Sequence, residues 1–152
     1  MEKTKVAIIG SREYTNKRKI QEFVFELKNR YKSEVVIVSG GAKFGADKYA
    51  KRFALDFDLD YHEFPPFHES HNMYCVLEKF HYGKPYNVGN YHGRNKRLVE
   101  YSDMVIAFVP AQVTNGTRSA IRYAEELGKK FVIITGWHIF IYRYMREMLW
   151  EN

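Results

Sequence analysis

Short apolar runs rich in β-branched residues alternate along this chain with segments whose apolar residues recur at helical spacing. This alternation predicts parallel β-α-β units, because parallel neighbours need a crossover connection, usually a helix. The expected fold is therefore α/β, with three α/β/α layers around a mainly parallel sheet of about five strands. Strands are expected at 5–9, 35–38, 60–64, 104–109 and 131–135, and helices at 16–31, 45–57, 94–101, 117–127 and 139–150.

The length of 152 residues fits a single domain, over 1–152, that is large enough to bury a core. The one cysteine, Cys75, excludes an internal disulfide framework and agrees with a reducing cytoplasm. No signal sequence precedes the first strand, and no apolar stretch reaches the roughly 20 residues of a membrane span. We therefore expect a cytoplasmic protein with no membrane partner. The formal net charge of +6 favours nucleic acid or small anionic ligands as partners.

Residues 65–93 interrupt the alternation of strands and helices. The segment is rich in His, Tyr and Asn and contains Gly83, Gly89 and Gly93. A loop of this length inside a compact domain is usually functional or flexible. We expect an insertion at about 65–93 that covers the ligand site, with a short helix near 73–80.

The final segment, 139–150, is apolar on most faces of the helix that it predicts. Packing within the monomer buries one stripe of such a helix, and the remaining apolar surface predicts a subunit interface. A homo-oligomer is therefore expected, most simply a dimer, with larger assemblies as the alternative.

Two glycine-bearing loops, at 39–47 and 115–117, follow strand-like runs and open helix-like segments. Backbone N–H groups at a helix start and the helix dipole both favour an anion, so phosphate is the expected guest. A third loop, Gly10-Ser11-Arg12, follows the first strand, and its arginine can pair with phosphate through a planar fork. Parallel sheets bind ligands at the carboxyl ends of their strands, where these loops lie. A nucleotide or nucleotide-derived ligand is therefore predicted.

The loop at 39–47 differs from two familiar phosphate-binding motifs. Gly40 and Gly45 have the spacing of a Walker A motif, but Ala46 stands where that motif has lysine. No Gly-x-Gly-x-x-Gly follows any predicted strand. Asp47 is expected either to cap the following helix or to contact a ribose hydroxyl.

Arg94 and Asn95 follow a glycine at a predicted helix start. An arginine at this place can hold a phosphate or stabilise developing charge, and the asparagine can contact a base or a sugar. The alternative is an exposed basic helix without a ligand.

Several histidines, together with Cys75, offer enough ligand types for zinc. The histidines are His62, His68, His71, His81 and His92. Their spacing fits no standard zinc site, and no Cys-x-x-Cys pair accompanies them. Polar residues of the insertion are the expected interpretation, and no metal site is assigned.

The ordered motifs Gly-Ser-Arg, Ser-Gly-Gly-Ala with Gly-Ala-Asp, Arg-Asn and Gly-Thr resemble the SLOG superfamily of Rossmann-like domains. The nearest branch is the YspA/YpsA-related proteins of bacteria and their phages. The resemblance covers about residues 5–135 and implies a Rossmann-like fold that binds nucleotides or their derivatives.

The loops and the resemblance together assign one ligand site. Its expected residues are Gly10, Ser11, Arg12, Ser39, Gly40, Gly41, Ala42, Gly45, Asp47, Arg94, Asn95, Gly116 and Thr117. The glycine-bearing loops would hold phosphate, Gly10 would let the ligand approach, and Arg12 and Arg94 would neutralise its charge. Binding without turnover, by a sensor or a ligand-sequestering protein, is the expected function.

Two better-understood relatives imply other functions. The "lonely guy" phosphoribohydrolases cleave a base from a nucleoside monophosphate, and their Met-His-x-Arg-Lys pattern is similar to residues 91–95, which places the catalytic arginine at Arg94. However, Ala120 stands where their catalytic glutamate is expected, and an oxocarbenium-like transition state needs a nearby carboxylate. The DNA-processing protein A family, which binds single-stranded DNA, has a similar glycine loop and Arg-Asn segment. The positive charge and many tyrosines suit base stacking.

Overall fold

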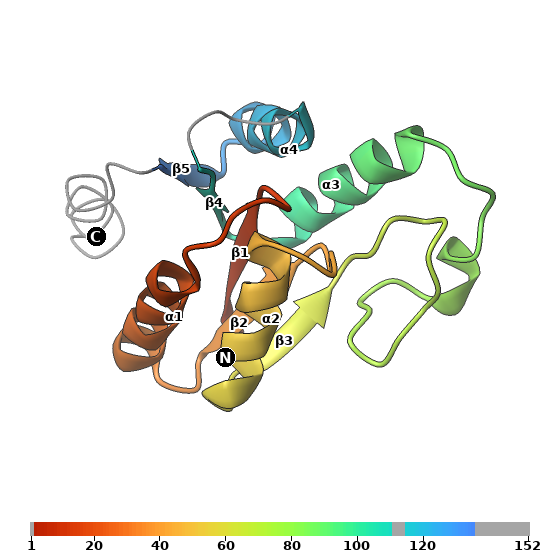
Figure 1. Ribbon diagram of the computed structural model, residues 1–152. Coiled ribbons are helices and arrows are strands. Elements are labelled where there is room, and N and C mark those ends of the chain that lie inside the picture. The colour runs from red at the N-terminus through yellow and green to blue at the C-terminus, as the bar shows by residue number, and fades with distance from the viewer. Residues whose placement is uncertain (1, 111–114, 136–152) are drawn as a thin grey trace.

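The computed structural model describes residues 2–110 and 115–135, and within them the strands form one parallel sheet in the order β3-β2-β1-β4-β5 (Figure 1). The strands are β1 (Thr4–Gly10), β2 (Val35–Ser39), β3 (Asp60–Glu63), β4 (Met104–Phe108) and β5 (Lys130–Ile134). The helices are α1 (Lys17–Tyr31), α2 (Ala46–Asp56), α3 (Gly89–Tyr101) and α4 (Asn115–Glu126), with one 3₁₀ turn, η1 (Lys79–His81). The predicted Rossmann-like α/β fold is confirmed.

Each face of the sheet has its own apolar core and its own pair of helices (Figure 1). Helices α1 and α2 cover one face, where Ile8 of β1 packs in the same cluster as Phe23 and Phe53. Helices α3 and α4 cover the other face, where Leu98 and Ala120 belong to the second cluster. Strands β2 and β4 are buried along their whole length, as expected for parallel strands that are covered on both faces.

The strand order reverses direction at the centre of the sheet. From β1, the chain first builds outward through β2 and β3, and then returns to add β4 and β5 on the other side. The crossover connections therefore diverge at the carboxyl ends of β1 and β4, which leaves a crevice at this edge. The loop after β1 and the start of α4 both lie at this crevice.

Helix α3 begins earlier than predicted, at Gly89 rather than at residue 94. The glycine that suggested a helix start, Gly93, lies inside the helix. A Cβ at this position would stand 2.9 Å from Cε2 of Phe67, so the missing side chain lets the insertion pack closely against α3. Close packing, not a helix boundary, therefore explains Gly93.

The short helix predicted near 73–80 is wrong, since only the 3₁₀ turn η1 forms at its end. Residues 74–76 instead run beside the end of β3: Glu63 N donates to Tyr74 O at 2.9 Å, and Val76 N donates to Glu63 O at 3.4 Å. The backbone groups of this segment form hydrogen bonds with the edge strand. In a helix the same groups would bond within the helix instead.

The predicted helix at 139–150, and with it the expected subunit interface, lies outside the described residues. Within residues 2–110 and 115–135, no helix has the length and apolar character needed to cross a membrane.

Candidate functional site

A cavity of about 550 Å³ opens at the carboxyl edge of the sheet, at the reversal of strand order. The loops after β1 and β2 and the helices α3 and α4 form its walls. The predicted site residues that line it are Gly10, Ser11, Arg12, Gly40, Ala42, Asp47, Arg94, Asn95, Gly116 and Thr117, whereas Ser39, Gly41 and Gly45 do not. Its place and size are those of a small-molecule site in an open parallel sheet.

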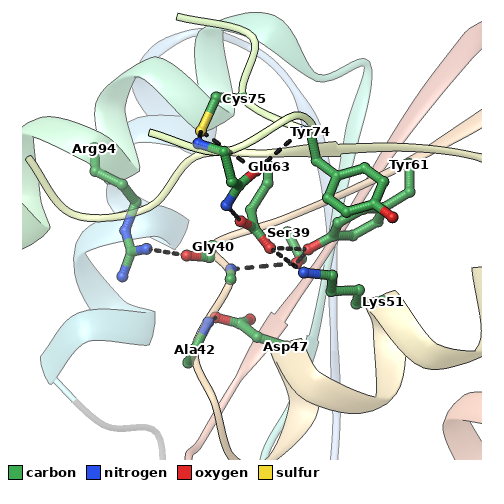
Figure 2. Close-up of polar contacts among 12 residues, drawn as sticks. Ser39, Gly40, Ala42, Asp47, Lys51, Tyr61, Glu63, Tyr74, Cys75 and Arg94 are labelled. Carbon is green, nitrogen blue, oxygen red and sulfur yellow. Dashed lines mark hydrogen bonds and ion pairs between the residues drawn. The ribbon is translucent and has the colours of Figure 1, made fainter. Parts of the chain in front are cut away.

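Two neighbouring residues of α3 hold the two glycine-bearing loops on opposite sides of the cavity. Arg94 Nη1 donates to Gly40 O at 2.8 Å and to Phe64 O at 3.0 Å, as Figure 2 shows for Gly40. Asn95 Nδ2 donates to Gly116 O at 3.2 Å. Helix α3 therefore fixes the spacing between the loop after β2 and the start of α4.

The backbone donors of the loop after β2 are partly engaged within the protein. Gly41 N donates to Ser39 Oγ at 3.4 Å, and Ala42 N donates to Asp47 Oδ2 at 3.2 Å (Figure 2). The N-cap of α2 is Gly45, and no side chain makes a capping hydrogen bond there. Asp47 therefore does not cap α2. Its carboxylate accepts the hydrogen bond from the glycine loop that a bound anion was expected to accept.

Of three glycines at this edge, two permit a close backbone approach and one does not. A Cβ at Gly10 would stand 2.0 Å from Phe108 O, and a Cβ at Gly45 would stand 2.2 Å from Ser11 O. Both residues thus allow backbone to approach backbone, which explains them without a ligand. Among the residues that the structure describes, a Cβ at Gly116 would meet nothing within 4 Å, although Gly116 lines the cavity.

Opposite charges lie close together in the cavity wall. Burial raises the pKa of Asp47 above its usual value, while the charge of Arg94 acts in the opposite direction. Burial likewise lowers the pKa of the Arg94 guanidinium, against the charge of Asp47. The Nε–H of Arg94 is buried and has no acceptor among the described residues. A buried donor without an acceptor is costly to the folded state.

The raised pKa of Asp47 predicts a pH dependence of stability. The folded-state pKa of Asp47 lies above the unfolded value of about 3.9, so Asp47 contributes fully to the free energy of unfolding below that pH. This contribution is lost as pH rises through the folded-state pKa. Thermal unfolding between pH 3 and 8 should show this loss, with a slope of at most about 1.4 kcal/mol per pH unit, and Asp47→Asn should remove it. The matched control is Asp56→Asn, at an exposed residue of α2. Equal pH slopes for the wild type and Asp47→Asn would contradict the assignment.

A buried polar cluster behind the glycine loop was not predicted from the sequence. Tyr61 OH donates to Glu63 Oε1 at 2.8 Å, and Ser39 Oγ lies 2.5 Å from Tyr61 OH (Figure 2). Asn72 Nδ2 donates to Glu63 Oε2, and Lys51 Nζ forms an ion pair with Oε1 at 3.5 Å. Burial and the Glu63 charge raise the pKa of Tyr61. Glu63, which is only 3% exposed, thus ties the insertion to the sheet.

The same carboxylate supports the glycine loop from behind. A Cβ at Gly41 would stand 2.5 Å from Cδ of Glu63, so the absence of a side chain permits this contact. The sequence feature that could have predicted this cluster is the alternation of side chains along β3. It places Tyr61 and Glu63 on the same, buried face of the strand.

The histidines considered for zinc have separate partners. His62 Nδ1 lies 2.7 Å from Tyr101 OH, and His92 Nδ1 lies 3.0 Å from Ser119 Oγ. In the part of the chain that the structure describes, no three His, Cys, Asp or Glu residues are grouped so as to hold a metal ion.

Solved structures with the same fold include two molybdenum cofactor proteins. The chain has 18% identity and a TM-score of 0.65 to the molybdenum cofactor binding protein of Rippkaea orientalis, covering 97% of this chain and 85% of that one. It has 12% identity and a TM-score of 0.63 to the molybdenum cofactor carrier protein of Chlamydomonas reinhardtii, covering 97% and 86%. At these identities, the similarity shows the shared fold.

A third similar structure is the DNA processing protein A of Helicobacter pylori, described as binding single-stranded DNA. The identity is 26% and the TM-score 0.64, over 88% of this chain and 66% of that one. No curated protein matches the chain. Residues 4–71 match the model of the YspA, cpYpsA-related SLOG family. This match confirms, for residues 4–71, the resemblance to the YspA, cpYpsA-related SLOG family that the motifs predict.

Proposed function

We propose that this protein binds a small nucleotide or nucleotide-derived ligand, whose phosphate lies at the start of α4. The observation that carries the proposal is the cavity at the reversal of strand order, where the first turn of α4 converges with Arg12 and Arg94. The first N–H groups of a helix have no partner within the helix, and the helix dipole adds positive potential. Arg12 supplies a full positive charge on the facing loop.

The start of α4 suits a phosphate better than the loop after β2 does. Gly41 and Ala42 already donate to Ser39 and Asp47, and the Asp47 carboxylate would repel a second anion. Gly116, by contrast, borders the cavity, and no atom of the described residues lies within 4 Å of the place that a Cβ would take there. The loop after β2 therefore shapes the cavity, and α4 holds the anion.

Binding without turnover fits the cavity better than hydrolysis does. Ala120 lines the wall at the position where the phosphoribohydrolases carry their catalytic glutamate. The buried carboxylate of the cavity, Asp47, accepts a hydrogen bond from Ala42. A sensor or a ligand-sequestering protein is thus our first candidate. The molybdenum cofactor proteins of the same fold support small-ligand binding as a class.

Single-stranded DNA binding is the second candidate. It is favoured by the likeness to the DNA processing protein A of Helicobacter pylori and by the net charge of +6. Affinity for DNA would fall steeply with salt concentration, because phosphate contacts release counterions.

The deciding experiment is a thermal-shift screen with nucleoside monophosphates, ADP-ribose, NAD, GTP, cyclic nucleotides and a short oligonucleotide. A ligand at 100 times its Kd stabilises the folded state by about 2.7 kcal/mol, which raises the Tm of a domain of this size by roughly 5 to 10 °C. Incubation with each hit then shows whether a free base is released. A response to the oligonucleotide alone would overturn the proposal in favour of DNA binding.

Gly116→Ala tests the phosphate position without disturbing the fold. The added methyl group meets no described residue within 4 Å and favours the helix, so stability should stay equal or rise by up to about 1 kcal/mol. Because Gly116 lines the cavity, the methyl group should take space from a phosphate bound there and lower the affinity for a phosphorylated hit about tenfold or more. Calorimetry of the variant measures the affinity. Unchanged affinity would place the phosphate elsewhere.

Arg12→Ala provides an independent test, because Arg12 is exposed and lines the cavity. Its loss should weaken the phosphorylated hit about tenfold and weaken the dephosphorylated nucleoside much less. Arg18→Ala, at an exposed residue of α1, is the matched control. Arg94→Ala is less informative, since Arg94 also holds the carbonyl groups of Gly40 and Phe64.

A further inference from the structure

We propose that Tyr86, Tyr91 and His68 form a stacking subsite at the cavity, and that it takes the planar nitrogen heterocycle of the ligand. The inference rests on the proposed function, because the heterocycle belongs to the molecule whose phosphate lies at α4. It narrows the ligand class to small phosphorylated molecules that carry an aromatic ring, and it separates them from sugar phosphates and inorganic anions.

The three rings form one compact aromatic cluster. The ring centroids of His68 lie 4.8 Å from Tyr86 and 5.1 Å from Tyr91, and the two tyrosine rings lie 6.3 Å apart. Their planes meet at 55° to 73°, so the rings pack in tilted and edge-to-face arrangements. Within the cluster, Tyr86 is the ring that stays exposed, and it is therefore the one on which a further ring can stack.

Hydrogen bonds from one asparagine hold the cluster in place. Asn90 Nδ2 donates to Pro85 O at 3.1 Å and lies 3.2 Å from His68 Nδ1. Asn90 therefore links the backbone next to Tyr86 with the ring that packs against Tyr86. A fixed aromatic surface costs little conformational entropy when a ligand stacks on it.

The open part of the cluster faces the proposed ligand site. Tyr86 lines the cavity, yet 71% of its surface is exposed, which is unusual for an aromatic ring that already has two ring neighbours. Val88, which also lines the cavity, is similarly exposed. Exposed apolar surface at a cavity that also contains a few charged and polar groups is typical of a ligand-binding wall.

Two arginines link the ring subsite to the phosphate site. The guanidinium carbon of Arg12 lies 5.5 Å from the centroid of the Tyr91 ring, and that of Arg94 lies 5.8 Å from it. Both arginines line the same cavity as Gly116. A ligand whose ring lies on Tyr86 and whose phosphate reaches α4 would therefore pass both positive charges.

Other exposed aromatic residues do not share this position. Phe80 belongs to the same insertion and is 66% exposed, but it does not line the cavity. This contrast makes Phe80→Ala a matched control for Tyr86→Ala, because both variants remove an exposed aromatic side chain from one segment.

The test compares AMP with ribose 5-phosphate, which keeps the phosphate and sugar but lacks the ring. Calorimetry of the full chain should show that AMP binds more tightly, and that Tyr86→Ala lowers AMP affinity about 5- to 150-fold, the range for loss of one base–aromatic stack. Ribose 5-phosphate affinity should be unaffected by Tyr86→Ala. Tyr86→Phe should retain AMP binding, and Phe80→Ala should match the wild type. GMP and CMP serve as further ring probes if AMP is a poor fit.

The outcomes separate this inference from the proposed function. If AMP and ribose 5-phosphate bind equally and Tyr86→Ala changes neither affinity, the phosphate site stands and the stacking subsite is wrong. If no mononucleotide or sugar phosphate binds the wild type, both proposals fail. If only an oligonucleotide binds, and Tyr86→Ala weakens it, the aromatic cluster serves nucleic acid, and the small-ligand form of the inference is overturned.

Discussion

Replacement of Glu63 by alanine is expected to lower the free energy of unfolding by about 3 kcal/mol and the Tm by roughly 6 to 12 °C. The variant leaves Tyr61 OH and the Asn72 amide without their acceptor, and Lys51 without its counter-charge. It also opens space behind Gly41. The insertion loses its side-chain anchor on β3 but keeps the backbone hydrogen bonds of residue 63 to Tyr74 and Val76. Thermal unfolding and urea unfolding should both report the loss.

Two further variants show whether the hydrogen bonds of Glu63 cause the effect. Glu63→Gln keeps the shape and one acceptor oxygen but replaces the other with a donor, so its loss of stability should be intermediate. Glu100→Ala removes a carboxylate from an exposed position of α3 and should change stability by no more than about 0.5 kcal/mol. If Glu63→Ala unfolds like the wild type, the cluster does not hold the insertion.

Gly45→Ala is expected to destabilise the protein by about 3 kcal/mol or more, for two reasons. Gly45 has φ +73°, where a side chain is strained, and the new Cβ would stand 2.2 Å from the backbone oxygen of Ser11. The loop must then move away from β1, which also breaks the hydrogen bond from Ala46 N to Ser11 O. Urea unfolding measures the change.

Gly128→Ala separates the strain from the close approach. Gly128 has φ +67°, but a Cβ there would meet nothing within 4 Å in the described ranges 2–110 and 115–135. Its replacement should therefore cost only the backbone strain, about 1 to 2 kcal/mol. Equal losses for the two variants would mean that the contact between the glycine loop and Ser11 contributes nothing to stability.

The architecture was predictable because its signals are local. The alternation of short β-branched runs with helical periodicity, together with the crossover rule, leads to a parallel sheet with helices on both faces. The same rule brings loops from distant parts of the chain to one edge. The positions of Arg12, Arg94 and Gly116 around one cavity followed from that rule and from the motif order.

The roles of individual residues at that edge depended on contacts between distant segments. Gly10 and Gly45 look like ligand-binding glycines in the sequence, but each lies against the backbone of another segment. A Cβ at Gly116, by contrast, would meet none of the residues described in the structure within 4 Å. Asp47 accepts a hydrogen bond from the loop instead of capping its helix.

The periodicity of the chain by itself determined the layers, the strand directions and the edge that carries the cavity, because these follow from residues a few positions apart. Only the tertiary structure decided that Glu63 bonds to Asn72 and that α3 begins at Gly89. The physical reason is that these features depend on the path of a long insertion, which folds against β3 and α3 through non-local hydrogen bonds and close packing that no local pattern encodes.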